Sequence, residues 1–217
     1  MTDSDIKEVY GISTRKANDL YKQYNIRNVK TLRAYIRKIP NLLNNSQINS
    51  LRYHSYVNKN IAYADANEFI TYILKYVKIE PVGSYVKKER HIKQLQFIST
   101  TPLSKHIEIL EKKNILTTTL NYNLDKFVGI VYFAKKDIYR ILEINKINTE
   151  EKPFALLFYN SSNSFINNIK RTAKRHNYIL TANGLFDKKN KRITNIKTEN
   201  DIFKILEIKY VHPEDRI

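Results

Sequence analysis

The sequence predicts an α+β fold with a helical N-terminal part, followed by central and C-terminal parts that mix strands and helices. Residues 1 to about 78 carry apolar side chains at helical spacing and show no strand alternation. From Pro81 onward, short segments with period-two alternation are separated by turns and single helices. The chain has 217 residues, which is enough for one large domain or two small ones with a true core.

The N-terminal part is expected to form four short helices. Their expected first or capping residues are Thr14, Thr31, Ser46 and Asp65. The second helix should stop near Pro40, because the residue before a proline is disfavoured in a helix. The fourth has the clearest apolar stripe, formed by Phe69, Ile70, Ile73, Leu74 and Val77.

The central part should contain one helix among several strands. Pro102 opens that helix. The expected strands span residues 92–98, 115–120, 127–133 and 138–144.

The C-terminal part is expected to start with a strand over residues 154–159. Residues 160–162 can cap the helix that follows, and short strands should then surround Asn183 and Gly184. A helix over residues 199–206 and a short final strand should complete the fold.

The chain is strongly basic, with 38 Lys and Arg against 21 Asp and Glu, a formal net charge of +17. Such an excess favours a polyanionic partner, either nucleic acid or an anionic membrane surface. The alternative is a basic protein whose charge serves only solubility.

Composition excludes several classes of site. There is no cysteine, so a disulfide framework, a zinc-thiolate site and a thiol nucleophile are impossible, and the five histidines show no metal-ligand spacing. The acidic N-terminal stretch MTDSDIKEVYG is unlike a signal peptide. No apolar run approaches the roughly 18 residues of a membrane span. We therefore expect an intracellular protein without a membrane partner.

The stretch from Pro81 to Ser99 combines a Gly83-Ser84 turn, a basic run and a strand. Glycine allows backbone N–H groups to approach an anion closely, so the turn can cradle a phosphate. In the strand, Gln94 and Gln96 flank Leu95 and must share one face.

The stretch DIKEVYGISTRKANDLYKQYNI resembles a helix-hairpin-helix, whose tight turn directs backbone N–H groups at a DNA phosphate. Ser13 stands where that hairpin usually has its second glycine. The candidate DNA-binding residues are Gly11, Ser13, Arg15 and Lys16. An ordinary turn between two helices is the alternative.

The C-terminal stretch ENDIFKILEIKYVHPEDRI resembles the end of family X DNA polymerases, the DNA polymerase beta family. In that family a D-I-F helix precedes a segment ending in K-Y-x-x-P-x-D-R. The matching residues here are Asp201, Ile202, Phe203, Lys209, Tyr210, Pro213, Asp215 and Arg216. The segment VGSYVKK is similar to the family's G-S-[FL]-R-R motif, LLNNSQINSLRYH resembles its fingers, and the whole is most similar to minimal viral members.

This resemblance implies three subdomains. Residues 1–80 would form helical fingers, residues 81–152 a nucleotidyltransferase-type palm with an antiparallel-rich mixed sheet, and residues 153–217 a small α+β thumb. No counterpart of the family's N-terminal lyase domain is expected.

The resemblance also implies a site. The family's palm holds two Mg²⁺ ions on three aspartates, and those positions fall here on Gln94, Gln96 and Glu143. An amide offers Mg²⁺ only a dipole, whereas the ion usually needs carboxylates as well as substrate phosphates. We therefore expect no catalytic residue and no metal cofactor, with at most a weak metal site at Glu143.

Binding functions can survive this loss. The resemblance assigns nucleotide or phosphate contacts to Gly83, Ser84, Lys87, Phe158 and Tyr159. Four basic residues recur at helical spacing in the thumb and predict a stripe along a DNA backbone: Lys170, Arg171, Lys174 and Arg175.

These features favour an inactive family X polymerase that binds duplex, gapped or nicked DNA. It would act as an accessory or scaffold in viral-type replication or repair, in the nucleus or cytoplasm of a host cell, with a possible protein partner. One alternative is an active gap-filling polymerase that uses Glu143, Mg²⁺ and a further carboxylate, for which Asp125 and Asp137 are candidates. Another is a protein-binding module that kept only the fold.

Overall fold

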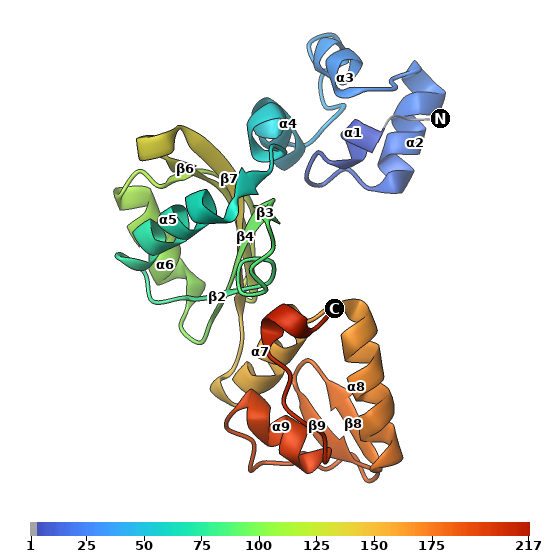
Figure 1. Ribbon diagram of the computed structural model, residues 1–217. Coiled ribbons are helices and arrows are strands. Elements are labelled where there is room, and N and C mark those ends of the chain that lie inside the picture. Colours follow the sequence, from blue (N-terminus) through green and yellow to red (C-terminus); the bar gives the residue numbers. More distant parts are fainter. Residues whose placement is uncertain (1–3) are drawn as a thin grey trace.

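The computed structural model describes residues 4–217 and places a mixed sheet between an N-terminal group of helices and a second α+β unit (Figure 1). Separate buried apolar clusters lie within residues 6–51, 61–144 and 154–206. We call the corresponding parts the N-terminal unit (4–58), the central unit (61–146) and the C-terminal unit (149–217). In residues 4–217, no helix is both long and apolar enough to span a membrane.

The N-terminal unit consists of α1 (Ser4–Lys7), α2 (Thr14–Tyr24), α3 (Val29–Tyr35) and α4 (Asn45–Val57). Ser13, Asn28 and Asn44 cap α2, α3 and α4, and each accepts a hydrogen bond from the third backbone N–H beyond it. The predicted helices are therefore present, but each cap lies one to three residues before the expected one. A capping residue has an extended backbone, as Ser13, Asn28 and Asn44 do here. The sequence alone does not show which of several neighbouring polar residues has that conformation.

The helix α5 (Tyr63–Leu74) belongs to the central unit, although we expected residues 1–80 to form one helical part. Its side chains Ala66, Phe69 and Ile73 are buried in the same cluster as Leu95 and Phe97 of the sheet. The helix begins two residues before Asp65. It follows a two-residue strand, β1 (Ile61–Ala62), where no strand was expected.

The central sheet has the strand order β2-β4-β7-β6-β5. Its strands are β2 (Glu80–Val82), β4 (Gln94–Ser99), β5 (Leu116–Tyr122), β6 (Lys126–Phe133) and β7 (Ile138–Lys146). Strands β4 and β7 are parallel and the other neighbours are antiparallel, which confirms the predicted antiparallel-rich mixed sheet. The predicted strand over residues 92–98 is divided, because β3 (His91–Ile92) leaves to pair with β1.

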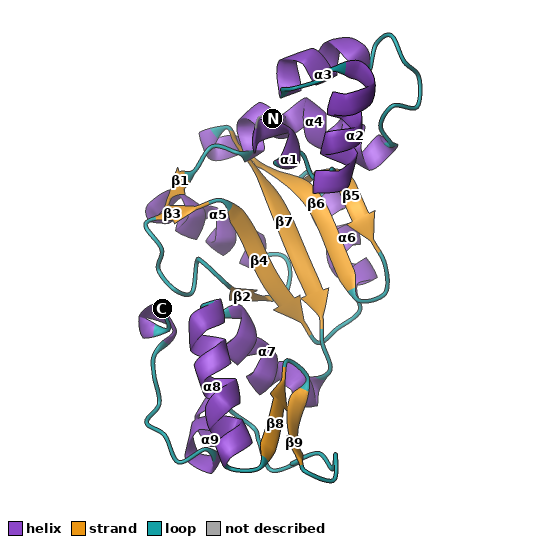
Figure 2. Cartoon of the chain, turned by 90° about the vertical axis from the view of Figure 1, so that its right-hand side faces the viewer, coloured by secondary structure: helices purple, strands orange, loops and turns teal. Residues whose placement is uncertain are grey.

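Helices α5 and α6 (Leu103–Lys112) cover one face of this sheet (Figures 1 and 2). Figure 2 shows the other face, with the N-terminal helices at its upper end and the C-terminal unit at its lower end. On this second face α4 packs over the upper part of β5 to β7 through Tyr53 and Val57. The lower part carries polar side chains.

The C-terminal unit opens with a helix, so the expected strand over residues 154–159 is wrong. The short turn η2 (Thr149–Glu151) leads into α7 (Lys152–Tyr159), and Pro153 stands in its first turn, where a missing N–H costs nothing. Phe154, Ala155 and Leu157 are buried. A short apolar run of this kind fits a buried strand and a buried helix equally well, so its periodicity did not discriminate.

The rest of this unit contains α8 (Asn163–Arg175), β8 (Tyr178–Thr181), β9 (Gly184–Asp187) and α9 (Glu199–Ile205). Ser162 caps α8, and β8 and β9 form the expected hairpin. A single bridge joins Phe186 of β9 to Arg192. The expected final strand is also wrong, because the described chain ends in a 3₁₀ turn, η3 (Pro213–Asp215).

The buried side chain of Arg216 fixes the end of the chain against the C-terminal core. Its side chain is 1% exposed, forms an ion pair with Glu199 and donates from Nε to the Val211 carbonyl oxygen. The rings of Phe203 and Tyr210 lie 5.5 and 5.4 Å from its guanidinium carbon. Burial raises the pKa of Glu199, while the Arg216 charge opposes that rise.

Replacing Arg216 by Met should therefore destabilise the C-terminal unit by roughly 3–5 kcal/mol, since Glu199 is left buried without a counter-charge. Urea unfolding measures the change. Arg216→Met combined with Glu199→Gln removes both charges and should be clearly less destabilised than the single variant. Equal losses for the two proteins would show that the ion pair is not the cause.

Candidate functional site

The parallel pairing of β4 and β7 places Gln94, Gln96 and Glu143 next to one another. Gln96 pairs directly with Glu143 across the two strands. Their neighbours Leu95 and Leu142 point into the core beneath α5 and α6. The three polar side chains therefore lie on the opposite face, the one turned toward the viewer in Figure 2.

Glu143 is held by three donors. The Gln94 amide donates to Oε2 at 3.1 Å and the Asn145 amide to Oε1 at 2.8 Å. The Nζ of Lys126, at the start of β6, lies 2.9 Å from Oε2. The Glu143 side chain is 13% exposed and that of Lys126 38%. The carboxylate is therefore largely removed from water and neutralised by an ammonium group.

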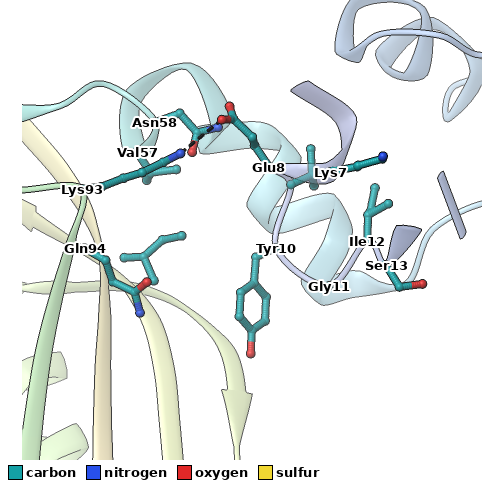
Figure 3. Close-up of a pocket in the computed structure, with 12 residues that line it drawn as sticks. Lys7, Glu8, Tyr10, Gly11, Ile12, Ser13, Val57, Asn58, Lys93 and Gln94 are labelled. Atoms are coloured by element: carbon teal, nitrogen blue, oxygen red, sulfur yellow. Dashed lines mark hydrogen bonds and ion pairs between the residues drawn. The ribbon is translucent and has the colours of Figure 1, made fainter. Parts of the chain in front are cut away.

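Two tyrosines bring the outer units to this carboxylate. Tyr10, in the N-terminal unit, extends from the turn after α1 toward the strands, with Gln94 across the intervening space (Figure 3). Tyr159 ends α7 in the C-terminal unit. Burial raises the pKa of both phenols, and the Glu143 charge contributes to each rise. The Glu143 charge thus influences one phenol in each of the two outer units.

The predicted phosphate turn is present, but its first donor is engaged within the chain. Gly83 has φ +74°, and its N–H donates to Oδ1 of Asn160 at 2.8 Å. A side chain here would be strained by the positive φ, and its Cβ would lie 2.3 Å from Oε1 of Gln96, which would have to move. The Gly83 N–H, one of the donors expected to contact a phosphate, is therefore bonded to an amide oxygen from the C-terminal unit.

The basic residues of this turn are paired as well. The Nζ of Lys87 lies 2.6 Å from a Glu89 carboxylate oxygen. The Nζ of the next residue, Lys88, lies 2.8 Å from a Glu214 carboxylate oxygen in the C-terminal unit. The turn thus connects the central and C-terminal units, and phosphate contact by Ser84 and Lys87 stays a prediction.

The predicted sugar-contacting pair lies at the end of α7. Tyr159 packs against Val82, Ile98 and Ala155 at the junction with the sheet. Phe158 lies under Lys170 of α8, whose Nζ is 5.1 Å from the ring centroid. Tyr159 therefore joins the C-terminal unit to the sheet, whereas Phe158 packs within the C-terminal unit. Their contact with a sugar stays a prediction.

The N-terminal turn has the geometry of a hairpin between two helices. Gly11 has φ +82°, and its carbonyl oxygen accepts from the Gln47 amide. Ser13 caps α2, and Arg15 is exposed. The turn borders a cavity of about 510 Å³ that also reaches Lys93 and Gln94 of the sheet (Figure 3). This placement is compatible with a DNA-binding hairpin, which stays a prediction.

The predicted basic stripe lies on the outer side of α8. Ile166, Ile169 and Ala173 bury the inner side of the helix. The exposed residues of the stripe are Lys170, Arg171, Lys174 and Arg175. The helix therefore presents four cationic side chains to solvent, as its spacing predicted.

Comparisons with known proteins agree with this architecture. Residues 155–217 match the family model described as DNA polymerase beta thumb. The chain is 29% identical over 147 residues to the Repair DNA polymerase X of African swine fever virus, a match covering 64% of this chain and 81% of that protein. The chain is a family X DNA polymerase-like protein.

Solved structures share the fold. Leishmania infantum polymerase beta in a ternary P/T complex has a TM-score of 0.83 at 22% identity, covering 98% of this chain and 96% of that one. The same enzyme in a ternary gap complex has a TM-score of 0.84 at 21% identity, covering 99% and 91%. Below, the N-terminal, central and C-terminal units are called by the names of the expected subdomains, fingers, palm and thumb; the family model covers the thumb alone.

The donor set of the palm does not suit the Mg²⁺ ions that the family resemblance implies. Gln94 and Gln96 contribute amides, and both Glu143 oxygens already accept hydrogen bonds from the protein. Asp137 precedes β7 and lies roughly 20 Å from Glu143 along the strand at about 3.3 Å per residue. Asp125 stands in the turn before β6. Among residues 4–217, no group of three His, Asp or Glu side chains is placed to hold a metal.

The sequence did not reveal Lys126, Asn145 or Asn160 as site residues. Lys126 and Asn145 are paired across β6 and β7, so a correct strand register would have identified them. Asn160 follows the Phe158-Tyr159 pair, but only the packing of thumb on palm brings it to Gly83.

Replacing Asn160 by Ala should destabilise the protein by roughly 1–3 kcal/mol, because the buried Gly83 N–H loses its acceptor. It should also accelerate hydrogen exchange at the Gly83 amide, measured by NMR. Asn163→Ala, at an exposed position at the start of α8, is the control and should change stability by less than about 0.5 kcal/mol. An unchanged Gly83 exchange rate in Asn160→Ala would show that Asn160 does not protect the Gly83 amide by accepting its hydrogen bond.

Proposed function

We propose that this protein binds gapped or nicked duplex DNA without extending it, as an accessory or scaffold in viral-type replication or repair. One observation carries the proposal: the only carboxylate among the three metal-ligand positions, Glu143, is paired with the Lys126 ammonium. The other two positions are the amides of Gln94 and Gln96.

Charge explains why such a palm should not polymerise. In a two-metal mechanism the ions hold the triphosphate and stabilise the attacking and leaving oxygens, and the protein supplies the negative charges that hold the ions. Two of those charges are missing here and the third is neutralised. A dication would have to displace an ammonium group from Glu143 and would gain a single carboxylate in return.

DNA binding does not depend on those charges. The net charge of +17 and the exposed basic side of α8 favour a polyphosphate partner. The similar Leishmania polymerase beta structures are a ternary P/T complex and a ternary gap complex, and the viral relative is named a repair polymerase. We extend the DNA partner to this chain because the thumb helix carries its basic residues at solvent-exposed positions.

An active gap-filling polymerase is the second candidate, favoured by the name of the viral relative. It would need a second carboxylate beside Glu143. Asp125 is the closer candidate, since it precedes Lys126, whose ammonium contacts Glu143.

Primer extension on a one-nucleotide-gapped duplex tests catalysis. With Mg²⁺ or Mn²⁺ present, the natural chain should shift this DNA in a gel but add no nucleotide. The comparison protein carries Gln94→Asp, Gln96→Asp and Glu143→Asp. Extension by the natural chain at an ordinary polymerase rate of about 1 s⁻¹ or more would establish the active alternative.

A salt series tests the thumb stripe. Lys174→Gln should lower affinity for gapped duplex and reduce the slope of log K against log[salt] by about one, since one fewer phosphate contact releases fewer counterions. Lys112→Gln is the matched control, because Lys112 lies on α6 on the opposite face of the sheet and should leave the slope unchanged. Equal slopes for the natural chain and Lys174→Gln would remove this residue from the interface.

A further inference from the structure

We infer that the Lys126 ammonium takes the place of a divalent cation in the palm, so that a DNA strand rests there without any metal ion. The inference depends on the proposed DNA binding and adds how the old catalytic surface takes part in it. We call that surface the palm floor, formed by Gln94, Gln96, Lys126, Glu143 and Asn145.

The palm floor is electrically neutral. Glu143 contributes one negative charge, Lys126 one positive charge, and the remaining members are amides. Three carboxylates at the metal-ligand positions would repel a DNA phosphate strongly unless cations lay between them. With two amides and an internal ammonium group, no added cation is required for a phosphate to approach.

The pairing of Lys126 with Glu143 is built into the sheet. Lys126 pairs with Asn145 across β6 and β7, two residues from Glu143 on the same face of β7. Its ammonium lies 2.9 Å from the same carboxylate oxygen that accepts the Gln94 amide. Because Glu143 is largely shielded from water, this attraction is stronger than that of an exposed surface pair.

Space for a strand exists on both sides of the floor. Gln94 borders the cavity of about 510 Å³ beside the fingers, and Tyr10 lies across it (Figure 3). Lys126 and Asn145 border a second cavity, also of about 510 Å³, between palm and thumb, which Tyr159 and Asn183 line from the thumb. Amide and phenol groups can donate hydrogen bonds to phosphate and sugar oxygens, as in many protein–DNA interfaces.

Fluorescence anisotropy with labelled gapped duplex tests the inference at constant ionic strength, with either EDTA or Mg²⁺ present. The natural chain should bind with affinities that agree within about twofold in the two buffers. Lys126→Gln exposes the charge of Glu143 and should bind about fivefold or more weakly in EDTA than in Mg²⁺. Lys126→Gln combined with Glu143→Gln removes both charges and should again bind equally in the two buffers.

Two lysine variants separate this effect from a general loss of positive charge. Lys112→Gln removes the same charge from the far face of the sheet and should show no difference between EDTA and Mg²⁺. Lys174→Gln should bind more weakly in both buffers by the same factor. If the natural chain needs Mg²⁺ to bind DNA, or if Lys126→Gln behaves alike in both buffers, the inference is wrong while the proposed DNA binding stands.

A second arm needs no DNA and uses Mn²⁺ alone, followed by electron paramagnetic resonance. The natural chain should leave the signal of free Mn²⁺ unchanged. A variant with Gln94→Asp and Gln96→Asp should bind Mn²⁺ about tenfold more tightly once Lys126→Gln is added, because the ammonium no longer competes for Glu143. Equal Mn²⁺ affinity with and without Lys126→Gln would overturn the inference, whatever the outcome with DNA.

Discussion

The ion pair between Glu143 and Lys126 is the interaction on which the centre of this protein depends. A carboxylate on the middle strand of a sheet whose side chain is only 13% exposed is stabilised by a positive partner. Lys126 provides the partner from the adjacent strand, and the amides of Gln94 and Asn145 satisfy the oxygens further. The same carboxylate influences a tyrosine from the fingers and another from the thumb.

The Gly83 turn is likewise held by contacts within the protein. At the Gly83 turn, an Asn160 oxygen from the thumb accepts a hydrogen bond from the Gly83 backbone N–H, and Lys88 pairs with Glu214. Side chains of the protein therefore make internal contacts at positions where the family resemblance implies metal and phosphate ligands. The contacts of Gly83 with Asn160 and of Lys88 with Glu214 join thumb to palm, whereas the pair of Lys126 with Glu143 lies within the palm sheet.

Local sequence patterns predicted most elements but not all of them. Alternation identified the strands of the sheet, and it placed Gln94 and Gln96 on one face because side chains on a strand alternate strictly. The same reasoning misassigned residues 154–159, whose apolar run suits a buried helix as well as a strand. It also left α5 with the fingers, although the apolar stripe of α5 packs on the palm sheet. Helical spacing says that a face is buried, but not against which partner.

The sequence by itself determined the basic charge, the resemblance to family X polymerases and the amides of Gln94 and Gln96, where that resemblance implies carboxylates. Each of these follows from residue identity and local order along the chain. Only the tertiary structure decided that Lys126 neutralises Glu143 and that Asn160 occupies the Gly83 turn. These contacts join residues 17 and 77 positions apart, so they depend on strand register and on the docking of thumb against palm. Neither register nor docking is encoded in any short stretch of sequence.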